Sequence, residues 1–181
     1  KNFSNHSKAV NSVGFSPDGS KLVSAGSDKL IKIYDSLSFK EVKSFMPHSD
    51  IVYCVRFSPC GKYLLSACED GSVKITDIEE TSEIATFKSH KRAVLSVAYS
   101  PKGHQILSGG RECCMKLFDI TDPEREIFNF SDHSDAIISV CFSPDSLTIL
   151  SGSIDMSMLL YDIEKGSLLR KIEALNAHPL S

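Results

Sequence analysis

This chain repeats the three residue types of a serine hydrolase triad. These are a histidine base, a serine nucleophile and an orienting aspartate. His6, Ser24 and Asp28 form the first set. Two further sets keep the same spacing, namely His48, Ser66 and Asp70, and then His133, Ser151 and Asp155. An enzyme needs one optimised nucleophile beside one oxyanion hole, so the repetition argues against chemistry. We therefore expect a structural role for these sets and no catalytic residue.

The adjacent cysteines Cys113 and Cys114, in the segment SGGRECCMKLFD, are the second candidate for chemistry. A zinc site needs further ligands at short spacing, and the sequence has no C-x-x-C pair and no second ligand pair. His104 is near in sequence but lies beyond a predicted strand. The sequence therefore predicts free thiols here, with no metal site and no cofactor.

These residues belong to a repeat. Four histidines, His6, His48, His90 and His133, follow one another at intervals of 42, 42 and 43 residues. Each is followed by a phrase of the kind VRFSPCGKYLLSACED, and then by an apolar stretch that ends in Asp. Four copies at one period indicate a repeat architecture rather than four separate sites.

Each repeat is predicted to form four short strands joined by turns. In the second copy we expect strands at residues 52–57, 63–67, 72–78 and 82–87, with a Pro-Cys-Gly turn after the first. The strands are apolar along most of their length, which suggests sheets that are covered on both faces. A four-stranded sheet achieves this by stacking radially against identical neighbours.

The repeat resembles the WD40 repeat, and the resemblance covers essentially the whole chain. Other residues replace the family's Trp before the Asp that ends the third strand: Tyr34-Asp35, Thr76-Asp77, Phe118-Asp119 and Tyr161-Asp162. The resemblance implies an all-β fold, a WD40 β-propeller of four consecutive four-stranded blades. It also implies that these blades are part of a larger propeller, which in this family often has seven.

Taking each histidine as the start of a unit divides the chain into repeats at residues 6–47, 48–89, 90–132 and 133–177. Residues 1–5 are then the end of an outer strand of a preceding blade, and residues 178–181 are the start of a further repeat. An open arc of blades exposes two apolar faces, so self-association through these faces is a further expectation.

Members of the family often contain a buried network in which the loop histidine bonds the acid of a tight turn, backed by a serine of the second strand. Carried over position by position, this implies a network in every repeat, including the third, where Glu112 replaces the aspartate. Its members are His6, Ser24, Asp28, His48, Ser66, Asp70, His90, Ser108, Glu112, His133, Ser151 and Asp155.

Partners of this family commonly dock on the top face, which is formed by the loops before the first strand and between the second and third strands. The resemblance places these residues there: Lys8, Asn11, Ser27, Asp50, Tyr53, Glu69, Lys91, Arg92, Leu95, Arg111, Asp135, Ile138 and Ile154. Basic residues of the third repeat lie beside acidic ones of the second. This mixture suits a peptide or protein segment of mixed charge, and Arg and Tyr are frequent interface anchors.

The composition sets limits on partners and compartment. A formal net charge of -3 gives no reason to expect nucleic acid, and no apolar run is long enough for a membrane span. Six cysteines without a regular framework favour a reducing intracellular compartment, cytoplasmic or nuclear.

The sequence favours a non-catalytic scaffold or adaptor that binds proteins or peptides, with no small-molecule substrate. One alternative is a substrate-recognition subunit of a ubiquitin ligase; another is an accessory domain of a larger enzyme whose catalytic part lies outside this chain. Ubiquitin-ligase receptors of this family that dock on the DDB1-type adaptor often carry an Arg two residues after a repeat's terminal Asp. Other residues stand there in this chain: Leu37, Glu79, Thr121 and Glu164.

Overall fold

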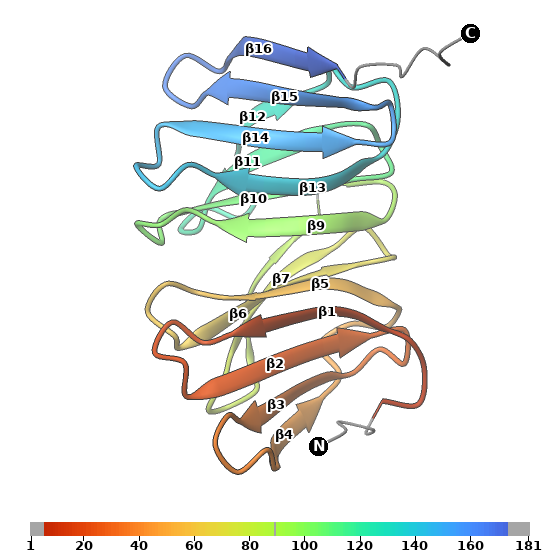
Figure 1. Cartoon of the computed structure of the whole chain (residues 1–181), viewed down its shortest axis with the longest axis vertical. Helices are drawn as coiled ribbons and strands as arrows, with labels where there is room; N and C mark the ends of the chain where they lie inside the picture. Colours follow the sequence, from red (N-terminus) through yellow and green to blue (C-terminus); the bar gives the residue numbers. More distant parts are fainter. Residues whose placement is uncertain (1–5, 89, 174–181) are drawn as a thin grey trace, which may run out of the picture.

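A computed structural model describes residues 6–88 and 90–173 (Figure 1). These residues form four antiparallel sheets, and each sheet has four strands in chain order. We call the sheets blades 1 to 4. The all-β fold of four four-stranded blades that the sequence predicts is confirmed.

The strands have the following bounds. Blade 1 contains β1 (Val10–Phe15), β2 (Lys21–Gly26), β3 (Ile31–Asp35) and β4 (Glu41–Phe45). Blade 2 contains β5 (Val52–Phe57), β6 (Tyr63–Cys68), β7 (Val73–Asp77) and β8 (Glu83–Phe87). Blade 3 contains β9 (Val94–Tyr99), β10 (Gln105–Gly110), β11 (Met115–Asp119) and β12 (Glu126–Phe130). Blade 4 contains β13 (Ile137–Phe142), β14 (Thr148–Ser153), β15 (Ser157–Asp162) and β16 (Ser167–Glu173).

The first strands of the blades, β1, β5, β9 and β13, contact one another in succession, and the blades follow one another along the molecule's longest axis (Figure 1). β2 and β14 point toward the right-hand edge of Figure 1, where the loops to β3 and β15 lie. The loops that precede the first strands lie at the same end. This end therefore corresponds to the top face, which the resemblance to the family defines by the same two sets of loops.

The turn between the first two strands of a blade explains the repeated Pro-x-Gly. In blade 2 the N–H of Ser58 donates to the carbonyl of Tyr63 at 2.8 Å and closes the turn. Gly61 has a φ of 73°, a conformation that glycine adopts at little cost because it lacks a Cβ. In blade 4 Ser146 takes the corresponding position with a φ of 62°.

Apolar side chains fill the three boundaries between successive blades. Ile31 and Ile33 of blade 1 lie in one buried cluster with Val55 and Leu64 of blade 2. Equivalent positions form the clusters between blades 2 and 3 and between blades 3 and 4. The strands of an interior blade are therefore apolar on both faces because each face has a neighbour.

The first face of blade 1 and the last face of blade 4 have no neighbour among the described residues. Val13 and Phe15 are 69% and 70% exposed, whereas Val55, at the position of Val13 in blade 2, is 0% exposed. A groove of about 460 Å³ runs over this face of blade 1. On blade 4, Met158 is 44% exposed, whereas the equivalent Met115 of blade 3 is 0% exposed.

The predicted outer strand at residues 1–5 and the predicted further repeat at 178–181 lie outside the described residues, as do Ser89 and residues 174–177 at the ends of two predicted repeats. The repeat boundaries therefore stay predictions. In the described ranges, no helix has the length and apolar character that a membrane crossing requires.

Candidate functional site

Every blade contains the same buried contact between a histidine ring and a serine hydroxyl. Nε2 of the histidine that precedes the first strand meets Oγ of a serine on the second strand at 2.7 or 2.8 Å. The pairs are His6–Ser24, His48–Ser66, His90–Ser108 and His133–Ser151. The serine side is buried in all four blades. In blades 2 to 4 the serine is fully covered, whereas Ser24 of blade 1, with its partner His6, borders the open groove on the first face.

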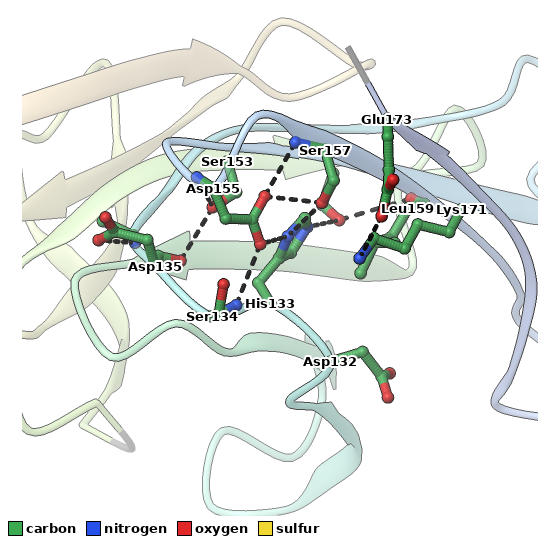
Figure 2. A network of polar contacts seen from close by, with 12 residues as sticks. Asp132, His133, Ser134, Asp135, Ser153, Asp155, Ser157, Leu159, Lys171 and Glu173 are labelled. Carbon is green, nitrogen blue, oxygen red and sulfur yellow. Dashed lines mark hydrogen bonds and ion pairs between the residues drawn. The ribbon is translucent and has the colours of Figure 1, made fainter. Parts of the chain in front are cut away.

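In blades 1 and 4 the other ring nitrogen meets the turn aspartate directly. Nδ1 of His6 lies 2.9 Å from Oδ1 of Asp28, and Nδ1 of His133 lies 2.8 Å from Oδ2 of Asp155 (Figure 2). The aspartate in each case also accepts a hydrogen bond from the backbone N–H of the residue after the histidine. In blade 4 the hydroxyl of Ser157 adds a further bond to Asp155, at 2.6 Å.

Blade 2 differs from the expected pattern. Nδ1 of His48 meets Oγ of Ser72 at 3.0 Å, and Ser72 in turn donates to Oδ1 of Asp70 at 2.6 Å. The predicted direct bond between His48 and Asp70 is therefore wrong, because a hydroxyl two residues after the aspartate takes its place. Asp70 is exposed as a result.

Blade 3 departs further. Oε2 of Glu112 lies 3.3 Å from Nδ1 of His90, yet this buried nitrogen has no aligned hydrogen-bond partner. The other carboxylate oxygen accepts the backbone N–H of Lys91. The thiol of Cys114 lies 3.6 Å from Oε2 of Glu112. The predicted histidine–acid hydrogen bond is thus not formed in blade 3, because the glutamate's extra methylene leaves the carboxylate badly aligned with the ring.

Burial and hydrogen bonding set the charge states of these groups. Burial works to raise the pKa of Asp155, but hydrogen bonds from Ser157, His133 and Ser134 outweigh it and hold the pKa well below its usual range. The pKa of Asp28 is lowered in the same way, with His6 as the main donor against the burial. Both carboxylates are therefore ionised at neutral pH.

The histidines of blades 2 and 3 are held neutral. Burial lowers the pKa of His48 to about 4, although the Asp70 carboxylate opposes the shift. Burial likewise lowers the pKa of His90 to about 4, and the ammonium of Lys116 acts in the same direction. Burial raises the pKa of the Cys114 thiol to about 11.

The third-strand positions that hold Trp in the family are all buried here. The hydroxyl of Tyr161 donates to Oδ2 of Asp132 at 3.1 Å, which gives blade 4 an additional polar anchor. Oγ1 of Thr76 in blade 2 is buried with no hydrogen-bond partner among the described residues. The missing indole is thus replaced differently from blade to blade.

On the top face, four predicted partner-binding positions share one backbone feature. The ladder between the first and second strands shifts register near the start of each blade. The unpaired residues at these β-bulges are Asn11, Tyr53, Leu95 and Ile138. A bulge re-aims its side chain, which explains how these strand residues reach the loop end of the blade.

Tyr53, Glu69 and Arg111 form one cluster across the boundary between blades 2 and 3. The Tyr53 hydroxyl donates to Oε2 of Glu69 at 2.5 Å, and Nη1 of Arg111 donates to Oε1 at 2.9 Å. The Arg111 guanidinium also lies 5.7 Å from the centre of the Tyr53 ring. The structure thus brings three predicted residues together and pairs them with one another, while the Arg111 side chain stays 49% exposed.

The other predicted partner-binding residues have different surroundings. Lys8, Lys91 and Arg92 are exposed, whereas Leu95 is half-buried. Carboxylates cap loops at two positions: Oδ1 of Asp50 accepts from the N–H of Ile51, and Oδ1 of Asp135 accepts from that of Ala136.

Two apolar side chains on blade 4 stay open to solvent: Ile138 and Ile154 are 54% and 55% exposed. Ser27, in contrast, is occupied within blade 1, where its hydroxyl accepts a hydrogen bond from the Asn11 amide at 3.2 Å.

A model of a known protein family matches this chain along most of its length. The model described as "WD domain, G-beta repeat" (WD40) matches residues 1–35, 39–77, 81–119 and 124–162. The chain belongs to the WD40 repeat family. WD40 repeat proteins generally serve as protein-interaction scaffolds and are generally not catalytic.

Individual relatives of this WD40 chain match it in part. A stretch of 41 residues is 56% identical to WD repeat-containing protein 1-A of Xenopus laevis and covers 23% of this chain and 7% of that protein. A chain in the crystal structure of the mitotic checkpoint complex matches 94% of this chain, with a TM-score of 0.87 and 24% identity. Our chain covers 53% of that chain, so it spans about half of its length. At this identity the match shows the WD40 fold alone.

One position of the WD40 network was missed by the sequence analysis. It lies two residues after the turn acid and is occupied by Ser72, Cys114 and Ser157 in blades 2 to 4. The structure places each of these side chains against the acid of its own blade. A signal existed, because aligned repeats show a small polar residue at this position in three of four copies, with Leu30 in the first.

Proposed function

We propose that this chain is a non-catalytic scaffold whose top face, at blades 2 and 3, binds a peptide or protein segment of mixed charge. The Tyr53–Glu69–Arg111 cluster carries the proposal. Its ring and guanidinium are held by internal bonds, so little side-chain freedom is lost when a partner covers them. Tyr and Arg are also the side chains that most often contribute strongly to protein interfaces.

The surroundings of the cluster supply both charges. Exposed Lys91 and Arg92 lie in the blade 3 loop, and together with Arg111 they border a hollow of about 440 Å³. On the other side, Asp50 of blade 2 lies 3.9 Å from Lys29 of blade 1, so this border carries one charge of each sign. A segment with an acidic residue over blade 3 and a basic or polar one over blade 2 fits this distribution.

The buried serines support the absence of catalysis. A nucleophile has to reach its substrate, and Ser66, Ser108 and Ser151 are fully covered within their blades. Ser24 borders the groove on blade 1, but it belongs to the same repeated set as the three covered serines. The similarity of the four sets supports a role in holding each loop to its blade, as expected for buried hydrogen-bonded groups.

Charge reversal on the top face tests the proposal. We expect Arg92→Glu with Arg111→Glu to remove partners that are captured by the wild-type protein and identified by quantitative mass spectrometry. The control reverses Lys62 and Lys102 to Glu, because these exposed residues lie in turns at the opposite end of blades 2 and 3. Partners that survive the top-face reversal, or that are lost equally in the control, would contradict the proposed site.

Self-association through the open faces of blades 1 and 4 also stays a prediction. The exposed Val13 and Phe15 support it, because their equivalents inside the stack are buried against a neighbouring blade. Light scattering of the wild type and of Phe15→Asp measures it directly. A concentration-independent monomer mass for the wild type would rule it out.

A further inference from the structure

Blade 3 brings a histidine, a glutamate and a cysteine together around a buried ring nitrogen that lacks an aligned hydrogen bond. The ligand atoms of His90, Glu112 and Cys114 all lie within 4.8 Å of one another. The His90 side chain is 1% exposed, and its Nδ1 is buried with no aligned hydrogen-bond partner. A buried nitrogen without a partner costs free energy, so the arrangement is incomplete as a hydrogen-bond network.

We propose that His90 Nδ1, Glu112 Oε2 and the Cys114 thiolate bind a zinc ion. An imidazole, a carboxylate and a thiolate together are a ligand set that zinc accepts. The thiol of Cys114 loses its proton to solvent as the zinc–sulfur bond forms. The thiolate and the carboxylate then balance the two positive charges of the ion.

Two of the three distances between the ligand atoms match a tetrahedral site. With zinc–nitrogen and zinc–oxygen bonds of about 2.1 Å and a zinc–sulfur bond of about 2.3 Å, the tetrahedral edges are about 3.4 Å for N···O and about 3.6 Å for S···O. The structure has 3.3 Å between His90 Nδ1 and Glu112 Oε2, and 3.6 Å between Cys114 Sγ and the same oxygen. Two of the three edges are therefore in place.

Neighbouring groups orient the ligands. Nε2 of His90 contacts Oγ of Ser108 at 2.7 Å, which fixes the ring, and the N–H of Lys91 holds the second oxygen of Glu112. Such outer contacts are typical of metal-binding histidines and carboxylates. Glu112 and Cys114 also border the 440 Å³ hollow on the top face, which gives an ion an entry path and leaves a fourth coordination position for water.

Blade 2 contains a similar set and provides an internal contrast. His48, Cys68 and Asp70 also have ligand atoms within 4.8 Å of one another. There, however, Nδ1 of His48 is satisfied by the hydroxyl of Ser72 at 3.0 Å. Cys114 occupies the position of Ser72 in blade 3, so the exchange of one oxygen for sulfur removes this partner and supplies a soft ligand.

Cobalt(II) serves as a spectroscopic probe for the site. We expect apo protein, prepared with a chelator and a reductant, to bind one equivalent of cobalt with a thiolate-to-metal charge-transfer band and tetrahedral ligand-field bands, and zinc to displace it. Cys114→Ser and His90→Gln should each weaken binding more than the roughly 10–100-fold that outer-contact changes cost. Cys113→Ser and Cys68→Ser are the controls and should retain the bands.

Cys114→Ser is expected to fold because blades 2 and 4 carry a serine at this position, and circular dichroism with a thermal scan checks this. Zinc should raise the melting temperature of the wild type and leave that of folded Cys114→Ser unchanged. A wild type without the charge-transfer band, or bands that persist in Cys114→Ser, would overturn the site. So would an equal loss in Cys113→Ser or Cys68→Ser.

Discussion

Blades 3 and 4 hold their histidines alike and differ in what meets the second ring nitrogen. In both, Nε2 of the ring is hydrogen-bonded to a buried serine hydroxyl, at 2.7 Å for His90 and 2.8 Å for His133. Nδ1 of His133 then meets Asp155 at 2.8 Å and the Ser157 hydroxyl at 3.3 Å. Nδ1 of His90 faces a carboxylate at 3.3 Å without an aligned bond.

Two substitutions within one repeat account for this difference. Glutamate is one methylene longer than aspartate, and the thiol of Cys114 is a weaker donor and acceptor than the hydroxyl of Ser157. The backbone of the repeat is therefore the same in both blades. In blade 4 both nitrogens of the histidine ring have hydrogen-bond partners (a closed network), whereas in blade 3 Nδ1 has no aligned partner (an open one). We expect the closed networks to stabilise their blades more than the open one, whose ring nitrogen has no aligned partner.

Removing the turn acid should give the largest difference in unfolding free energy between blade 3 and blade 4 variants. We expect Asp155→Ala to lower the free energy of unfolding by about 2–3 kcal/mol, because His133, Ser157 and two backbone N–H groups lose a charged acceptor. Glu112→Ala in metal-free protein should cost less, about 1 kcal/mol, since His90 has no aligned bond to lose and only the Lys91 N–H and the weak Cys114 thiol contact go. Urea unfolding measures both, and equal losses would remove the distinction.

Blade 2 adds a pH dependence to the comparison. The folded pKa of His48, about 4, lies below its ordinary value of 6.5, so the unfolded chain binds a proton in that range that the folded one excludes. The free energy of unfolding is therefore unaffected by this group well above pH 6.5. It falls by on the order of 2–3 kcal/mol as the pH drops from 6.5 through 4, because protonation favours the unfolded chain. The groups that act on the ring are the Asp70 and Glu83 carboxylates and the Lys74 ammonium.

His48→Gln should reduce the decline of urea stability between pH 6.5 and 4 and leave the part due to His90, whose pKa burial also lowers to about 4. The exposed His104→Gln serves as control. A slope that stays unchanged in His48→Gln would show that His48 does not exclude a proton in the folded protein.

Equivalent glycines of blades 3 and 4 test the effect of a neighbouring blade. A Cβ on Gly109 would lie 2.8 Å from Ile137 and 2.9 Å from Val140 of blade 4, whereas one on Gly152 meets nothing within 4 Å. We expect Gly109→Ala to cost about 1–2 kcal/mol through overpacking. Gly152→Ala should be neutral or stabilise slightly, since alanine loses less backbone freedom than glycine on folding. Thermal unfolding of both variants checks this, and equal shifts would contradict it.

Exchanging the blade 3 residues for those of blade 4 should have the smallest effect. Glu112→Asp with Cys114→Ser supplies the side chains that bond His133, so we expect metal-free protein to gain about 1 kcal/mol. The reverse exchange in blade 4, Asp155→Glu with Ser157→Cys, should lose a similar amount. A double variant that is less stable than the wild type would show that the blade 3 backbone cannot accommodate the closed network.

Much of the fold follows from the sequence, because the period places the strands. Val52–Phe57 matches its predicted range of 52–57, and Tyr63–Cys68 extends the range 63–67 by one residue. The strand prediction needs only the sequence: short apolar segments, turns marked by Pro and Gly, and a fixed interval to the next copy. The histidine–serine pairs follow for the same reason, since both residues keep their place in every repeat.

The rest was decided by side-chain geometry in three dimensions. Which group meets Nδ1 of His48 depends on whether a hydroxyl or a carboxylate arrives at bonding distance, and both were available in the sequence. The pairing of Arg111 with Glu69 joins residues 42 positions apart across a blade boundary. Cys114 becomes a candidate metal ligand only in the folded chain, where His90, 24 residues earlier, lies beside Glu112 and Cys114. The repeat fixes where each backbone position lies, but hydrogen bonds and metal ligation depend on shifts of under 1 Å, which only the packed structure sets.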